Sequence, residues 1–200
     1  MAGTAAPPGD LRQRLAADLE DAYPALVRAH ADAVYGAALR LSGSPADADD
    51  IAQETFVRAY RALRRYDVAR RRTLHVRPWL LTITVNLWRN ERRRAARRPV
   101  TVATAVHNGA RAAPGLDPPD AGPGPEDRAL ATDAGRALAA LLLRLPPHHR
   151  APLVLHHVAG LTYPEVATTL RCPVGTAKAN AARGLERLRA LATTPTEEDP

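Results

Sequence analysis

A stretch rich in proline and glycine divides this chain into two helical halves. Residues 99–125 contain six prolines and four glycines, among them the run DPPDAGPGP. Such a composition cannot supply a packed core, so we interpret it as a linker. A flexible chain of this length has an end-to-end distance of roughly 30 Å and a reach of at most ~90 Å. The sequence therefore predicts two small domains that could sit on different turns of one duplex, each with a marginal core.

The charge indicates a polyanionic partner. The formal net charge is +7, and Lys178 is the only lysine among 28 basic residues. A GC-rich genome explains much of the arginine content but not its clustering, and nucleic acid is the expected partner. Cys172 stands alone, which excludes an internal disulfide and favours a reducing compartment. No long apolar run indicates a signal peptide or a membrane span, so we expect a soluble, cytoplasmic protein without membrane insertion.

The first half reads as a series of helices. Residues 1–9 form a lead, and a helical pattern begins near Leu11. A helix follows Pro24 and ends at residues 42–43, and the next begins at residue 45 with Ser44 as its cap. That helix has two faces. Its apolar side carries Ala52, Phe56, Ala59 and Leu63, and its polar side carries Asp50, Gln53, Glu54, Val57 and Arg61. The polar side is either solvated surface or a docking face.

A third helical pattern runs from Pro78 to Arg98. Its apolar stripe is Leu80, Ile83, Thr84 and Leu87. A second stripe, at spacings of three and four, carries Trp79, Thr82, Asn86, Arg89, Arg93 and Arg97. Guanidinium groups bind phosphates, an amide can read a base edge, and an indole can stack on an exposed base. We interpret this face as a nucleic-acid surface, although the arginines would also suit an exposed helix end.

The second half ends in a pattern typical of a helix-turn-helix. An apolar stripe of Leu138, Leu141, Leu142 and Leu145 stops at residues 146–147, and a short helix follows from His149 to Val158. Thr162 and Glu165 have the spacing of a capping box, and the helix they begin ends near Leu170. After a turn at residues 171–173, a last helix carries Val174, Ala177, Ala181, Leu185 and Leu188 on one side.

The sequence gives little indication of a catalytic site or a metal site. The chain has no paired catalytic groups, so we expect no enzyme, no cofactor and no metal. The pairs at residues 148–149 and 156–157 lack the spacing of the common zinc sites, and the one thiol lies well downstream. We expect His148 and His149 to be exposed and Cys172 to be a small turn residue rather than a redox sensor.

Four strings of this sequence resemble the extracytoplasmic-function (ECF) sigma factors, the two-domain members of the sigma-70 class. They are ADADDIAQETFVRAYRAL, RPWLLTITVNLWRNERRR, LPPHHRAPLVLHHVAGLTYPEVATTL and CPVGTAKANAARGLERLR. The resemblance covers about residues 20–192. It implies an all-α fold with a lead at 1–18, sigma region 2 at 19–98, a flexible linker at 99–128, region 4 at 129–192 and a tail at 193–200.

The resemblance also implies partners and binding residues. The partners would be core RNA polymerase, promoter DNA and an anti-sigma factor. Polymerase docking is implied for Asp50, Gln53, Glu54 and Arg58. The loop from Tyr66 to Arg77 and the helix after it would open the strands and read the minus-ten element. The residues implied for this role are Tyr66, His75, Trp79, Thr82, Asn86, Arg89 and Arg93. Reading of the minus-thirty-five duplex is implied for Thr162, Thr176, Lys178, Asn180 and Arg183.

Three points stay open at this stage. The family commonly has Val-Lys-Ser-Arg where this chain has residues 177–180, Ala-Lys-Ala-Asn, so base contacts from this helix should be sparser. The linker, with its acids Asp117, Asp120, Glu126 and Asp127, is either a tether or a segment that passes through the polymerase. The alternative function is a stand-alone helix-turn-helix repressor that binds a palindrome as a dimer, which a single recognition helix and a long linker disfavour.

Overall fold

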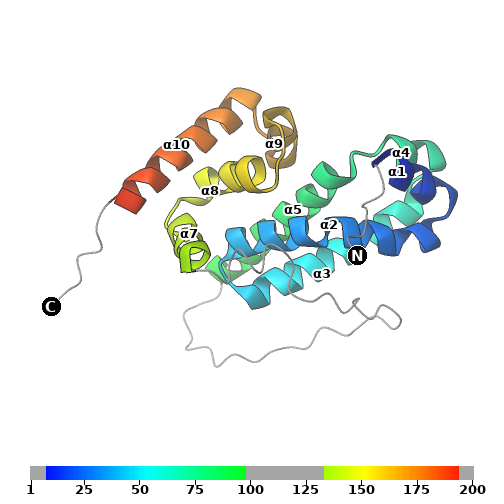
Figure 1. Ribbon diagram of the computed structural model, residues 1–200, viewed down its shortest axis with the longest axis horizontal. Helices are drawn as coiled ribbons and strands as arrows, with labels where there is room; N and C mark the ends of the chain where they lie inside the picture. The colour runs from blue at the N-terminus through cyan, green and yellow to red at the C-terminus, as the bar shows by residue number, and fades with distance from the viewer. Residues whose placement is uncertain (1–7, 98–132, 194–200) are drawn as a thin grey trace.

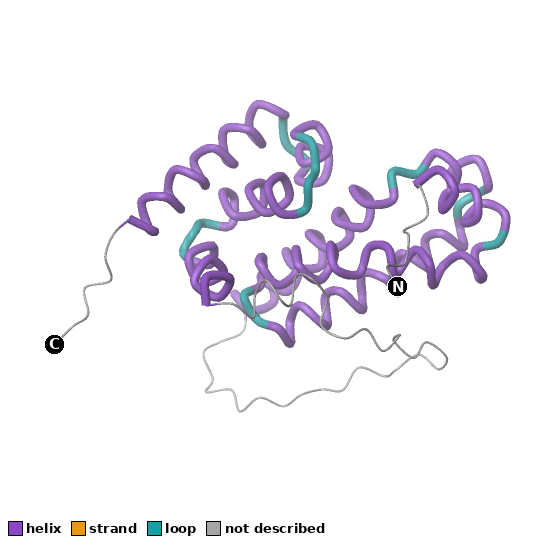
Figure 2. The backbone as a smooth tube through the Cα atoms, in the orientation of Figure 1, coloured by secondary structure: helices purple, strands orange, loops and turns teal. Residues whose placement is uncertain are grey.

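The computed structural model describes residues 8–97 and 133–193, and every regular element in those ranges is a helix (Figures 1 and 2). The first range contains α1 (Pro8–Ala17), α2 (Leu19–Ser42), α3 (Pro45–Arg65), α4 (Val68–Thr73) and α5 (Val76–Arg97). The second contains α7 (Asp133–Leu143), α8 (Pro147–Leu153), the π-helical turn η1 (Val154–Val158), α9 (Tyr163–Leu170) and α10 (Val174–Thr193). The expected all-α class is confirmed. None of these helices is long and apolar enough to cross a bilayer.

The helix α2 begins before Pro24, where the sequence alone placed its start. The carboxylate of Asp18 caps it by accepting hydrogen bonds from the backbone N–H groups of Glu20 and Asp21, at 2.9 and 3.1 Å. Leu19 and Tyr23 are buried in the same first turns. The cap and this burial together outweigh the backbone hydrogen bond that Pro24 cannot donate.

The break between α2 and α3 lies where the sequence predicts it. Gly43 takes a left-handed conformation with φ of 79°, and its N–H donates to Leu39 O at 2.7 Å. Ser44 then caps α3 by accepting from the N–H of Asp47. A Cβ at Gly43 would collide with the side chain of Leu143 on α7, so the second half of the chain closes over this turn. The positive φ is the reason that glycine is favoured here, since the exposed side chain of Leu143 could move away from an added Cβ.

The contact between α3 and α5 contains a pair of buried hydroxyl groups. The Oγ1 atoms of Thr55 and Thr84 lie 3.2 Å apart, and both side chains are fully buried. Each hydroxyl is also within hydrogen-bonding distance of a carbonyl one turn earlier, that of Ile51 or Leu80. The pair satisfies two polar groups inside an apolar contact and fixes the register of the two helices.

The segment expected as a loop from Tyr66 to Arg77 contains a short helix. Asp67 caps α4 by accepting from Arg70 N at 2.7 Å, and α5 begins at Val76, two residues before Pro78. Helix formation follows from an N-capping aspartate ahead of residues with good helix propensity. The expectation of a plain loop was wrong because it gave no weight to this cap.

In the second half, the helix-turn-helix is confirmed and the segment before it is modified. The stretch expected as one helix from His149 to Val158 is α8 followed by η1, whose wider turn is closed by Ala159 N donating to Val154 O. In the stripe ahead of it, Leu142 and Leu145 are buried, but Leu138 is exposed.

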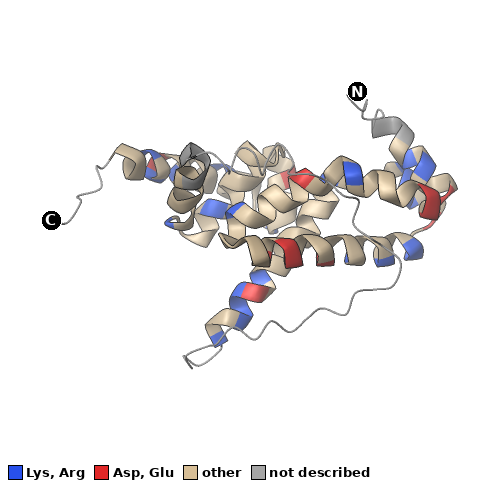
Figure 3. Ribbon diagram, turned by 60° about the horizontal axis from the view of Figure 1, so that its bottom comes forward, with Lys and Arg blue, Asp and Glu red and all other residues tan. Residues whose placement is uncertain are grey.

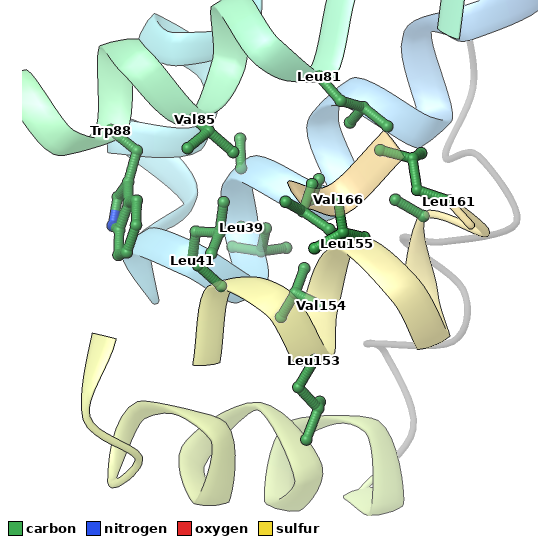
Figure 4. Packing of buried hydrophobic residues seen from close by; sticks show 14 of the residues in the cluster. Leu39, Leu41, Leu81, Val85, Trp88, Leu153, Val154, Leu155, Leu161 and Val166 are labelled. Atoms are coloured by element: carbon green, nitrogen blue, oxygen red, sulfur yellow. The ribbon is translucent and has the colours of Figure 1, made fainter. Parts of the chain in front are cut away.

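The two described ranges share one hydrophobic core (Figure 4). Helix α5 packs on α9, and α2 packs on α7, α8 and η1. From the first range the cluster includes Leu39, Leu41, Leu81, Val85 and Trp88. From the second range it includes Leu153, Val154, Leu155, Leu161 and Val166. The two halves therefore form a closed body, in contrast to the independently placed modules that the linker composition suggests.

Polar contacts add to this closure. Buried Arg150 of α8 donates from Nη1 to Leu41 O at the end of α2, at 2.9 Å, and Arg77 of α5 donates from Nε to Ala159 O, also at 2.9 Å. Burial, together with the nearby positive charge of Arg92, lowers the pKa of Arg150. The guanidinium of Arg150 thus satisfies one of the last carbonyls of α2 across the junction.

Candidate nucleic-acid and polymerase interface

The polar face of α3 is accessible along its length. Asp50, Gln53 and Arg58 are exposed and Glu54 is partly exposed. Glu54 accepts a hydrogen bond from Arg58 Nε at 2.6 Å, an exposed pair one helical turn apart. Such pairs stabilise a helix weakly, by about 0.3–0.5 kcal/mol. Because these two charges compensate each other, Asp50 is the residue of this group that presents an uncompensated negative charge.

Tyr66, Trp79 and Arg70 meet at the start of α4 and α5. The rings of Tyr66 and Trp79 are tilted, with centroids 6.0 Å apart, and the guanidinium of Arg70 lies 4.0 Å from the centre of the Tyr66 ring. Both rings are half-buried. A cation and two aromatic rings of this kind provide a surface on which an unpaired base can stack. Arg70 is a residue that the sequence analysis did not single out.

Some side chains of the second stripe of α5 face solvent, and others contact the second half of the chain. Thr82 Oγ1 lies 3.2 Å from Thr169 Oγ1 of α9, and Arg89 Nη2 donates to Leu170 O at 3.4 Å. Burial first, and then the positive charges of Arg93 and Arg171, lower the pKa of Arg89. Thr82 and Arg89 are thus occupied by α9 in this arrangement, and Asn86 between them is half-buried.

The C-terminal turns of α5 are fully available. Residues 90–97, Arg93 among them, are exposed, and Figure 3 shows this end of α5 coloured largely as basic residues. Arg92 also lies 5.2 Å from the centre of the Trp88 ring. This end of α5 carries more arginine than its dipole needs.

Glu165 closes the first turn of α9. Its Oε2 atom accepts from Thr162 N at 2.8 Å, as the capping-box spacing predicts, and also from Thr162 Oγ1 at 2.7 Å. These two hydrogen bonds, and to a smaller extent the charge of His75, lower the pKa of Glu165. His75 itself is exposed. Thr162 is exposed as well, but its hydroxyl is occupied by Glu165.

The recognition helix α10 presents most of the expected side chains to solvent. Thr176, Lys178 and Arg183 are exposed, whereas Asn180 is half-buried. Asn180 lines a groove of about 280 Å³ between α5, α8 and α10. The other lining residues are Trp88, Arg89, Arg92, Pro147, His148, Ala151, Pro152, Leu170 and Cys172. The outward face of α10 therefore has three of the four expected side chains.

The two histidines of each pair contact one another, and His156 also contacts the ring of Tyr163. The rings of His148 and His149 meet edge to face at 4.3 Å, and His156 stacks on Tyr163 at 4.0 Å. His148 is exposed as expected, but His149 is half-buried, and burial lowers its pKa. Within residues 8–97 and 133–193 no three potential metal ligands converge. The linker acids lie outside the described residues.

Together these regions define a two-part helical protein with a basic helix end in one half and a helix-turn-helix in the other. The family model for sigma-70 region 2 matches residues 26–98, and the model for sigma-70 region 4 matches residues 135–188. The chain therefore belongs to the sigma-70 family of RNA polymerase sigma factors, in its ECF group. Proteins of this family are transcription regulators.

Named relatives agree with this assignment. The chain is 36% identical over 164 residues to the ECF RNA polymerase sigma factor SigE of Mycolicibacterium smegmatis, covering 82% of this chain and 59% of that protein. It is 30% identical over 171 residues to the ECF sigma factor SigW of Bacillus subtilis, covering 85% and 88%.

Solved structures have the same fold. The structure of CnrH in complex with the cytosolic domain of CnrY matches with a TM-score of 0.63 and 25% identity, covering 92% of this chain and 97% of that one. The sigma factor RpoE, in complex with the anti-sigma factor NepR from Bartonella quintana, matches with a TM-score of 0.59 and 20% identity, covering 89% and 98%.

Proposed function

We propose that this sigma factor acts in the cytoplasm, where it directs core RNA polymerase to promoters by dividing recognition between its two halves. The α4–α5 surface, from Tyr66 to Arg93, opens and reads the minus-ten element, and α10 reads the minus-thirty-five element as duplex. The observation that carries this proposal is the position of a stacking surface and a basic helix end in one half and of an exposed recognition helix in the other.

Polymerase docking is assigned to the polar face of α3. Asp50, Gln53 and Glu54 lie on one side of a helix whose opposite side is held in the core by Ile51, Thr55 and other residues. Asp50, whose negative charge the Glu54–Arg58 pair leaves uncompensated, suits a basic partner surface.

Reading the minus-ten element requires the two halves to separate. Thr82 and Arg89 cannot contact DNA while Thr169 and Leu170 O occupy them. Like charges favour separation, because Arg171 lies near Arg89 across the junction and Arg92 lies near Arg150. Closure is therefore a balance between apolar burial and repulsion, and binding to polymerase shifts that balance.

An anti-sigma protein is the further partner we propose. CnrH and RpoE, whose folds match this chain, were both solved in complexes, and NepR is named an anti-sigma factor. Such a partner would hold the halves together or cover α3, and in either case it would compete with core polymerase.

The test of the function follows complex formation with core polymerase by size-exclusion chromatography, with a parallel sample of free duplex DNA. Stable binding to core and weak binding to free DNA is the expected result. Asp50→Arg should weaken core binding, whereas Asp32→Arg, a matched reversal at an exposed site on α2, should not. Tight binding to DNA without any association with core would instead favour the helix-turn-helix repressor.

A further inference from the structure

Helix α4 lacks an apolar anchor of its own. It is six residues long, contains no buried residue, and exposes 46% of Val68. A helix this short is unstable in isolation, so its position must be imposed by contacts with its surroundings. Its N-cap, Asp67, closes its first turn but does not connect it to the rest of the molecule.

Arg71 supplies that connection. Its Nε donates to Leu63 O at 3.0 Å and its Nη1 donates to Leu15 O at 3.4 Å, and the side chain is half-buried. These carbonyls lie in the last turns of α3 and α1, where the helix dipole is negative, and Leu63 O also accepts from Tyr66 N at 3.1 Å. One guanidinium thus joins the ends of two helices to α4.

Three consecutive arginines of α4 have three different environments. Arg70 lies over the ring of Tyr66, Arg71 binds the two carbonyls, and Arg72 is exposed. Arg70 and Arg71 are adjacent on one short helix. The two hydrogen bonds of Arg71 therefore also fix the position at which the guanidinium of Arg70 contacts the ring of Tyr66. The contact with Arg70 in turn fixes the orientation of the Tyr66 ring, which faces Trp79.

Helix α1 is the second support of α4. It packs on both α2 and α4, and Leu11 and Leu15 are buried in the cluster that also contains Val76 and Leu80. Tyr66 and Trp79 pack against the same cluster. This helix precedes residue 26, where the match to sigma-70 region 2 begins, and it falls in the segment that the sequence analysis treated as a lead.

We propose that Arg71 is a positioning residue, which together with α1 holds α4 and Tyr66 in place to capture an unpaired promoter base. Arg71 does not contact DNA in this proposal, and α1 is part of the base-reading site although it touches no base. The inference rests on the proposed reading of the minus-ten element by this surface.

The test uses the holoenzyme and a DNA probe whose constant upstream duplex ends in a randomised single strand of about six nucleotides, within the site size of single-strand-binding surfaces. Bound DNA is recovered and sequenced, and the enrichment of each base is measured at each position. Wild-type holoenzyme should enrich particular bases. If it enriches none, the proposed reading of the minus-ten element fails, before any question about Arg71 arises.

Arg71→Ala should lower the enrichment of the preferred base by about tenfold, the scale of losing one stacked base, while binding to core stays unchanged. Arg72→Ala is the matched control, since it removes the same charge from the next, exposed residue. It should reduce recovery of all sequences alike and leave the enrichment intact. Arg71→Lys keeps the charge but cannot bridge two carbonyls with a planar fork, so it should behave like Arg71→Ala.

Two results would overturn the proposal. Full enrichment with Arg71→Ala would show that α4 needs no such hold, and full enrichment with Arg71→Lys would show that charge alone matters, as for a phosphate contact. The role of α1 is tested by Leu11→Ala, which trims its contact with the cluster at the edge of the core. This variant should also reduce enrichment while retaining helicity and core binding, and unchanged enrichment would remove α1 from the site.

Discussion

Locking the two halves together should abolish promoter opening. The change is Thr82→Cys with Thr169→Cys in a Cys172→Ser background, which removes the only native thiol. The hydroxyl oxygens of the two threonines lie 3.2 Å apart, one on α5 and the other on α9. A disulfide needs about 2.05 Å between its sulfur atoms, so a small adjustment closes the bond.

The size of the effect follows from the loop that the bond closes. The two residues are 87 positions apart, and the chain-entropy relation gives about 4.5 kcal/mol of stabilisation for a loop of that length. At ~3 °C per kcal/mol for a chain of this size, the melting temperature should rise by about 13 °C. That rise reports that the bond has formed without distorting the fold. Opening, in contrast, requires the bond to break.

The assay measures open-complex formation by holoenzyme on a promoter, with oxidised and reduced forms of the same variant compared. Oxidised protein should show only the activity of its unoxidised fraction, and reductant should restore the activity of the reduced form. The two single-cysteine variants control for the substitutions themselves. If oxidised protein with the higher melting temperature opened promoters as fast as its reduced form, the reasoning that Thr82 and Arg89 must leave α9 would be refuted.

Three further expectations concern charge, packing and pH. Replacing Arg89 and Arg93 by alanine should reduce the slope of log affinity against log salt by about 0.9 for each lost duplex phosphate contact, and an unchanged slope in fluorescence anisotropy would exclude those contacts. Leu142→Ala, at a fully buried site of the shared core, should cost about 2–5 kcal/mol and shift tryptophan fluorescence and circular dichroism together, whereas two separate transitions would indicate independent halves. Because the folded pKa of Glu165 lies below its ordinary value of 4.5, its stabilising contribution is present above that pH and is lost as pH falls through the folded pKa. Thr162→Ala should raise that pKa and flatten the acid dependence, and an unchanged pKa by NMR titration would contradict this.

Local signals predicted much of the fold. Ser44 caps α3, the spacing of Thr162 and Glu165 marks the start of α9, and the all-α class follows from helical periodicity. Each of these depends on residues close together in the sequence. Hydrogen bonds within one turn can be read from spacing alone.

Long-range packing could not be predicted in the same way. Leu81, Val85 and Trp88 lie outside the apolar stripe chosen for α5, yet all three are buried, because the second half of the chain covers them. A helix that is buried on two sides carries two apolar stripes, and the periodicity analysis identified only one of the two. For the same reason, Thr82 and Arg89 were identified as surface residues, and their contacts with α9 were not foreseen.

The sequence predicted which residues belong to the candidate site better than it predicted how those residues are arranged. Tyr66 and Trp79 were both selected, but their ring contact, the role of Arg70 and the carbonyl contacts of Arg71 depend on α4, which the sequence analysis read as loop. The available signal was Asp67 three residues before Arg70, an N-cap ahead of a short helix.

The buried pair of Thr55 and Thr84 has a mechanical consequence. Their hydroxyl groups meet at one point of the contact between α3 and α5, so sliding either helix along the other would separate the two oxygens and leave each hydroxyl only the carbonyl of its own helix. Because α3 and α5 also pack along their length, we expect the two helices to move together. A partner that displaced the outer face of α3 would then also displace the arginines at the C-terminal end of α5.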